Sequence, residues 1–350
     1  SIFNYYLSFL KNSGNAKLNV SLVMFTSIFC VSLNIYFVAI VKLGPIGLSY
    51  GLLISNTLVF IFATIYFIKD YGYKLKISIL IYSIKLSLPL VPTGFLSISG
   101  KYFDKYIISA MSSMGGVGIY SISQKISDLS FLFMTAIQKV YGPIVYSKMF
   151  DNNLKNGDRE LGVYLTPFAY LSIFATLIIS LFSEEALIIL APPEYLSGLK
   201  IINVLCLSLS MSFFSKQPQL MYAGKTGVSS LLILISFILK IILVYILVNK
   251  LGIIGAAYGV FIVSIIYNFL LIWQGQKFYK INYEWTKLFI IYFTLIIMSS
   301  SILVIIEYNI DYVFRIMIKL LYVGIFLGLG NHLRIITKNN LFLIFNKQSR

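Results

Sequence analysis

Long apolar segments alternate along the whole chain with short polar connections. A membrane-spanning α-helix needs roughly 20 consecutive, mostly apolar residues. The chain is therefore expected to be an all-α, polytopic transmembrane helix bundle. The pattern predicts ten spans, at residues 18–40, 46–68, 77–111, 117–147, 161–182, 198–220, 228–249, 255–274, 286–306 and 312–331.

The third and fourth expected spans are longer than one membrane crossing requires, so they should tilt, kink or extend beyond the bilayer. Pro89 and Pro92 give the third span a reason to kink. The longest expected outer connection is 183–197, which contains Glu184 and Glu185. No segment outside the membrane is long enough to bury a core of its own.

Basic residues are distributed very unevenly between the two sets of connections. One set carries about 17 Lys and Arg residues, whereas the alternate set carries only Lys42 and Lys250. Because Lys and Arg accumulate in cytoplasmic connections, this asymmetry places both ends of the chain in the cytoplasm. Treating 101–105 as a loop would invert the asymmetry in every later connection. We therefore expect these residues to lie on a continuous helix.

Composition agrees with a membrane protein and removes several other classes. Of the 350 residues, 59% are hydrophobic and 11% charged, against about 25% charged in a typical soluble domain. The net charge of +16 follows from the cytoplasmic connections, so nucleic acid is not an expected partner. Cys30, Cys206 and His332 lie far apart in the sequence, which argues against a disulfide framework or a metal site.

A short internal repeat suggests how the spans are organised. The segment Lys42–Gly51 (KLGPIGLSYG) closely matches Lys250–Gly259 (KLGIIGAAYG), although glycine-rich turns between apolar helices could resemble each other by chance. Repeated halves are common in transporters. The repeat predicts three parts: the last two helices of a first lobe (1–76), a complete six-helix lobe (77–275), and two accessory helices with a cytoplasmic tail (276–350). About four helices, roughly 130 residues, are then expected before Ser1.

Three short motifs lie close together in the chain: LPLVP at 88–92, DKYII at 104–108 and GIYS at 118–121. They resemble the start of the second lobe in O-antigen flippases, the polysaccharide-export members of the multidrug/oligosaccharidyl-lipid/polysaccharide exporter superfamily. The segment APPEY at 191–195 resembles the family's Gly-Pro-Glu-Tyr outer turn, and 252–259 resembles its glycine hairpin.

The resemblance implies a substrate and a mechanism. The substrate would be an undecaprenyl-diphosphate-linked oligosaccharide, turned from the inner to the outer leaflet of the bacterial inner membrane by alternating access. Membrane lipids, a polysaccharide polymerase and a chain-length regulator are the implied partners. The family usually has Asp-Arg where this chain has Asp104-Lys105, which keeps the charge but loses the bidentate phosphate geometry of arginine.

Charged and polar residues inside the expected spans are the candidates for binding this substrate. A charge at the bilayer centre costs about 2.5–3.5 kcal/mol on insertion scales, so such residues should face a cavity or each other. Gln124, Asp128, Thr135, Gln138 and Lys139 form one polar stripe at helical spacing. The predicted cavity residues are Lys101, Asp104, Lys105, Gln124, Lys125, Asp128, Lys139 and Lys240.

Structural roles remain open for the same residues. Asp104 could pair with Lys101 or Lys105, and Asp128 could pair with Lys125. Lys139 could simply lie near the end of its span. Lys85 and Lys216 are better explained by snorkelling and topology, and Arg315 and Lys319 lie in the accessory helices and are not expected to be site residues.

The predicted function is therefore transport without enzymatic activity or a resident cofactor. Asp104 and Asp128 are candidates for proton or sodium coupling, because they are the carboxylates expected well inside the spans. Two alternatives remain. A cation-coupled small-molecule exporter would need an acidic cavity, whereas the candidates here are mostly basic. An O-antigen polymerase or lipid-linked glycosyltransferase would need a catalytic constellation in a sizeable outer loop.

Overall fold

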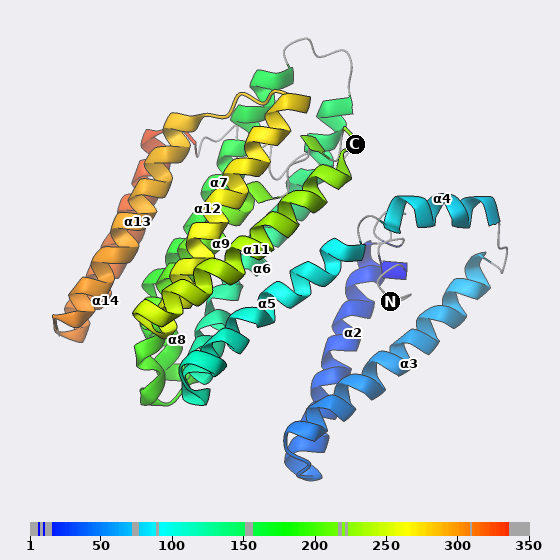
Figure 1. Ribbon diagram of the computed structural model, residues 1–350, viewed down its shortest axis with the longest axis horizontal. Helices are drawn as coiled ribbons and strands as arrows, with labels where there is room; N and C mark the ends of the chain where they lie inside the picture. Colours follow the sequence, from blue (N-terminus) through cyan, green and yellow to red (C-terminus); the bar gives the residue numbers. More distant parts are fainter. Residues whose placement is uncertain are drawn as a thin grey trace. The chain divides into compact units, whose positions relative to one another are not determined.

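The computed structural model describes residues 6–7, 10, 16–71, 77–88, 91–150, 157–215, 219–220, 223–308 and 310–335. These residues form helices joined by short connections, and no strand occurs among them. The predicted all-α class is thereby confirmed. The chain divides into two units, Ser1–Ser83 and Ile84–Arg350, which are described separately (Figure 1).

The first unit contains a helical hairpin. Helix α2 (Ala16–Ile35) continues through a short π-helical segment, η1 (Tyr36–Ile40), and turns into α3 (Pro45–Tyr71). Pro45 suits the first turn of α3, where a backbone N–H has no partner within the helix. Most apolar side chains of α2 and α3 are exposed, as expected for helices in contact with lipid.

The expected third span, 77–111, is two helices rather than one. Helix α4 covers Ile77–Ser87 and α5 covers Val91–Met111, while residues 89 and 90 lie outside the described residues. The reason is in the sequence, because proline lacks an N–H and clashes with the carbonyl of the residue four positions earlier. Helix α5 runs without interruption through 101–105, so the loop interpretation of that segment is excluded.

The second unit is a bundle around five helices: α6 (Met114–Phe150), α7 (Gly157–Leu181), α9 (Leu199–Met211), α11 (Thr226–Leu251) and α12 (Ile253–Phe278) (Figure 1). Helix α9 is shorter than the predicted span 198–220. Short 3₁₀ segments extend it on both sides, η3 (Pro193–Gly198) and η4 (Ser212–Ser215).

Small hydroxyl side chains join α6 to α9. Ser123 and Ser127 donate hydrogen bonds to the carbonyls of Gly198 (3.3 Å) and Ile202 (3.2 Å). Such small residues let helix backbones approach closely, which is how helices pack where the hydrophobic effect cannot drive association. This contact fixes the face that α6 presents to the interior of the bundle.

Two further helices, α13 (Trp285–Glu307) and α14 (Tyr312–His332), pair at one edge of the second unit (Figure 1). They pack on α7, where the Tyr170 ring stacks on Phe326 at 5.1 Å and its hydroxyl donates to the Phe326 carbonyl at 2.8 Å. Helix α8 (Ser183–Leu190) occupies part of the expected outer loop 183–197. That segment is therefore partly helical, and Glu184 in it is buried.

Eight helices of the described part of the chain are long and apolar enough to cross a membrane, so the protein is a multi-pass membrane protein. They correspond to the predicted spans other than the third and fourth. Helices α5 and α6 differ because polar and charged residues interrupt their apolar sequence. The total of ten spans stays a prediction.

The two copies of the internal repeat share two features at their glycines. Gly44 and Gly252 immediately precede the second helix of each hairpin, with φ values of +58° and +66°, a region that glycine adopts without strain. The turns differ at Lys42, which also has a positive φ, whereas the equivalent Lys250 lies within α11. The next glycines, three residues on, lie against the backbone of the preceding helix. Built Cβ atoms there would come within 3.0 Å of the Phe37 backbone for Gly47, and 2.1 Å of the Leu247 carbonyl oxygen for Gly255.

Candidate functional site

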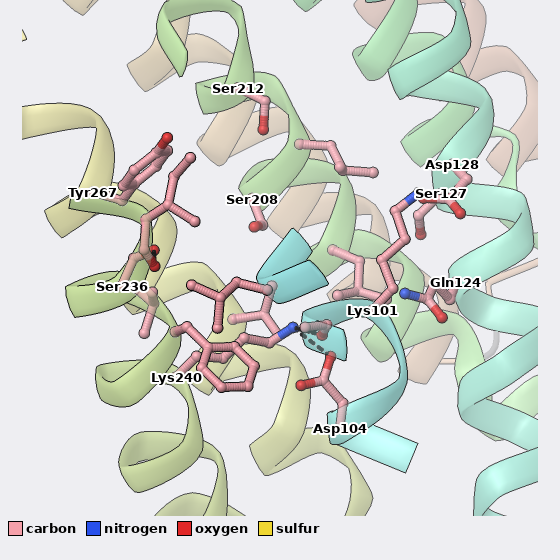
Figure 2. A pocket seen from close by; sticks show the side chains of 18 of the residues that line it. Lys101, Asp104, Gln124, Ser127, Asp128, Ser208, Ser212, Ser236, Lys240 and Tyr267 are labelled. Atoms are coloured by element: carbon pink, nitrogen blue, oxygen red, sulfur yellow. Dashed lines mark hydrogen bonds and ion pairs between the residues drawn. The ribbon is translucent and has the colours of Figure 1, made fainter. Parts of the chain in front are cut away.

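A cavity of about 360 Å³ lies among α5, α6, α9, α11 and α12 (Figure 2). Its walls are partly apolar, with Leu205, Phe237 and Val260 among the lining residues. Its polar groups converge from all five helices and from η4. Five of the eight predicted site residues line it: Lys101, Asp104, Gln124, Asp128 and Lys240.

A buried ion pair forms one side of this cavity. The Lys240 ammonium lies 2.9 Å from Oδ2 of Asp104 and donates to the Gly100 carbonyl at 2.5 Å. The Tyr120 hydroxyl donates to the same Asp104 oxygen at 3.2 Å. The sequence suggested Lys101 or Lys105 as the partner of Asp104. The packing of α11 against α5 instead brings in Lys240, because both helices border the same cavity.

The opposite side of the cavity is formed by α5 and α6. Figure 2 shows the Lys101 side chain reaching from α5 toward Gln124 and Asp128 on α6. The Lys101 ammonium lies 5.6 Å from the centre of the Phe131 ring, a cation–π distance. Within the described residues, Lys101 has no carboxylate within salt-bridge distance. Its ammonium can therefore bind a ligand without first breaking a salt bridge.

The other three predicted site residues do not line the cavity. Lys105 is half-buried, with its ammonium 5.7 Å from the Tyr102 ring centre, and Lys125 and Lys139 are exposed. Helix geometry explains the separation. Lys105 and Lys125 each point about 100° away from a neighbouring lining residue, Asp104 and Gln124, and Lys139 lies about 16 Å along the axis from Asp128.

The charge of the cavity lining is balanced, which corrects the expectation of a net basic cavity. Two lysines (Lys101 and Lys240) and two aspartates (Asp104 and Asp128) contribute to it. Positive charge is in excess only just outside the lining. Lys101 and Lys105 both interact electrostatically with Asp128, and Lys105 also interacts with Lys125 and Asp104.

Several cavity residues escaped the sequence analysis. Ser208 and Ser212 lie four residues apart, and so do Ser236 and Lys240, a spacing that places each pair on one helix face. That spacing was a usable signal, but serine is common in membrane helices and does not by itself indicate a cavity. Tyr120 and Tyr267 could not be distinguished from the many tyrosines of the chain.

A second charged cluster joins α8 to α14, outside the cavity. Lys319 is fully buried, and its ammonium lies 3.0 Å from Glu184 and 2.6 Å from Glu185. Arg315 also pairs with Glu184. The sequence analysis had placed the two glutamates in an outer loop and left both basic residues aside. Only the tertiary structure brings these four residues together.

No group of three or more metal-ligating side chains occurs in the described parts of the chain.

The fold is similar to that of a solved structure described as the lipid II flippase MurJ in an inward closed conformation. The TM-score is 0.63 at 20% sequence identity, and the match covers 89% of this chain and 67% of that one. No protein-family model matches the chain, and no curated protein sequence does. The protein therefore has a fold similar to that of this structure.

Proposed function

We propose that this protein flips a lipid-diphosphate-linked oligosaccharide, such as an O-antigen repeat unit, across the bacterial inner membrane by alternating access. The supporting observation is a charged cavity lined by five helices in a fold similar to that of a lipid II flippase. The headgroup of such a substrate is strongly polar and cannot cross hydrocarbon unaided. A polar cavity removes most of that cost.

The cavity offers suitable chemistry for both parts of the headgroup. Lys101 and Lys240 supply ammonium groups for the diphosphate, and lysine binds phosphate as a point charge without a rigid fork. Ser208, Ser212 and Gln124 supply donors and acceptors for sugar hydroxyls. Weak, adaptable contacts of this kind suit a carrier, which must release what it binds.

The proposed function includes the lobe organisation. In it, 77–275 is a complete lobe, 1–76 ends the preceding lobe, and 276–350 is accessory. The matching glycine geometry of the two hairpins supports this organisation. Asp104 and Asp128 remain the candidates for ion coupling in the proposal.

Alanine variants of the full-length protein in a flippase-null strain test the proposal. Replacing Lys101 or Asp128, which line the cavity, by alanine is expected to reduce surface glycan roughly tenfold, since each change removes one charge-assisted contact or its counter-charge. Lys105→Ala, just outside the lining, is expected to have a smaller effect, and Lys105→Arg to retain activity. The matched control is Lys250→Ala, an exposed lysine on α11. Normal glycan in both the Lys101 and the Asp128 variant, at normal protein levels, would refute the assignment of the site.

A small-molecule cation exporter is the second candidate, because two aspartates line the cavity. Their surroundings argue against it. Asp104 is paired with Lys240, and Asp128 interacts electrostatically with Lys101 and Lys105, so the cavity presents no excess of negative charge to an organic cation. Efflux of toxic cations by the full-length protein in a sensitised strain would favour the exporter instead.

A further inference from the structure

The two members of the Asp104–Lys240 pair differ in their access to the cavity. The Lys240 side chain is 18% exposed, whereas that of Asp104 is only 2% exposed. A ligand entering the cavity therefore meets the ammonium and not the carboxylate. Figure 2 shows Lys240 reaching across from α11 to Asp104 on α5.

Other contacts and side-chain flexibility bear on how Asp104 and Lys240 could separate. The Tyr120 hydroxyl donates to Asp104 independently of Lys240, so the carboxylate keeps one hydrogen bond when the lysine moves. The second carboxylate oxygen, Oδ1, is buried and has no hydrogen-bond partner among the described residues. Lys240 ends a flexible four-carbon chain, and its ammonium can turn toward the cavity without a shift of α11.

We propose that Asp104 is an internal counter-ion, which holds the Lys240 ammonium in the cavity wall. In an exchange of partners, a phosphate group of the substrate then takes the place of the Asp104 carboxylate beside that ammonium. This inference rests on the proposed anionic substrate. Asp104 is then a positioning residue that never touches the ligand. Because the ligand must compete with it, Asp104 keeps the affinity low enough for release.

The exchange has a consequence for the helices. The ion pair is the polar part of the contact between α5 and α11, whose apolar part includes the edge-to-face pair Phe103–Phe237 at 6.0 Å. When phosphate takes the ammonium, this contact loses its charged member and α5 is freer to move relative to α11. Substrate binding would thus be linked to helix movement through a single lysine.

A structural role for the pair and the counter-ion role predict opposite results for Asp104→Asn. If the pair only holds the site together, breaking it should weaken ligand binding. If Asp104 competes with the ligand, the variant should bind more tightly, because Lys240 is released while asparagine still accepts the Tyr120 hydrogen bond. Charge pairs at this distance have coupling energies that correspond to roughly tenfold or more in affinity.

The experiment measures binding of farnesyl diphosphate and of inorganic pyrophosphate to the purified full-length protein, with farnesol as the uncharged control. Asp104→Asn is expected to bind both diphosphates roughly tenfold more tightly than the wild type. The gain should disappear in Asp104→Asn/Lys240→Gln. If only farnesyl diphosphate shows it, the ligand is recognised as a lipid; if both do, recognition lies in the diphosphate.

Asp128→Asn is the matched control, since it removes the same charge from the same cavity without a salt bridge to Lys240. Its effect should therefore be the same with Lys240 or Gln at position 240. Unchanged or weaker binding by folded Asp104→Asn overturns the proposal. It is also overturned if Lys240→Gln changes diphosphate binding equally in Asp104→Asn and in Asp128→Asn.

A second variant keeps the proposal testable if Asp104→Asn does not fold. Tyr120→Phe removes the other partner of Asp104, so the carboxylate should hold Lys240 more strongly and binding should weaken about threefold. Unchanged binding would contradict the exchange. If the wild type binds diphosphate but these variants do not behave as expected, only the counter-ion role fails. Failure of the proposed function would instead appear in the surface-glycan assay.

Discussion

Replacing Lys319 by methionine is expected to destabilise the protein by about 3–5 kcal/mol, the usual cost of removing one partner from a buried ion pair. Lys319 is fully buried and pairs with both Glu184 and Glu185. In the variant, Arg315 still pairs with Glu184, but Glu185 loses its partner in a largely buried position. Thermal unfolding of the purified protein in detergent measures the effect.

The surface pair Lys200–Glu307 provides the control. Both side chains are about half exposed, so Lys200→Met should cost at most about 1 kcal/mol. Adding Glu185→Gln to Lys319→Met should recover part of the lost stability, because it removes the unpaired charge. If Lys319→Met were as stable as Lys200→Met, the cluster would not hold α14 to α8.

Replacing Gly255 by alanine is expected to cost about 3 kcal/mol or more, at the upper end of the range for overpacking. A built Cβ would lie 2.1 Å from the Leu247 carbonyl oxygen and 2.4 Å from its carbon. These are backbone atoms of α11, so relief requires the two helices of the hairpin to separate. Loss of folded protein on size-exclusion chromatography and a lower unfolding temperature would report it.

Gly227→Ala is the control for this substitution. Gly227 lies in the first turn of α11, and a built Cβ meets nothing within 4 Å. Alanine there should be neutral or stabilise the protein by about 0.4–1 kcal/mol, because it reduces the entropy of the unfolded chain. Equal effects at both positions would show that the close approach at Gly255 is not what the hairpin depends on.

The two hairpins show which parts of the fold could be predicted from short segments of the sequence. Their glycines were recognised as a repeat from letters alone, and the geometry of each turn follows from φ values that glycine adopts readily. The helical state of 101–105 followed instead from the chain as a whole, since the asymmetry of basic residues across all connections required it. The division into α4 and α5 was only partly anticipated, as a kink at the prolines.

The lining of the cavity was likewise predicted only in part. Lys101 and Asp104 on α5, and Gln124 and Asp128 on α6, were found because helical spacing reports which residues share a face. Lys105, Lys125 and Lys139 were predicted with them, because spacing alone shows neither how far a cavity extends along a helix nor how much of its circumference the cavity includes. The balanced charge of the lining was missed for the same reason.

The order of apolar and polar residues was therefore enough to establish an all-helical membrane protein, the positions of most helices and a short list of interior charges. These properties depend on neighbours within a few turns and on the cost of exposing polar groups to lipid. The pairing of Asp104 with Lys240, and of Glu184 and Glu185 with Lys319, was decided only by tertiary packing. Each pair joins helices distant in sequence, and which helices meet depends on the packing of the whole bundle.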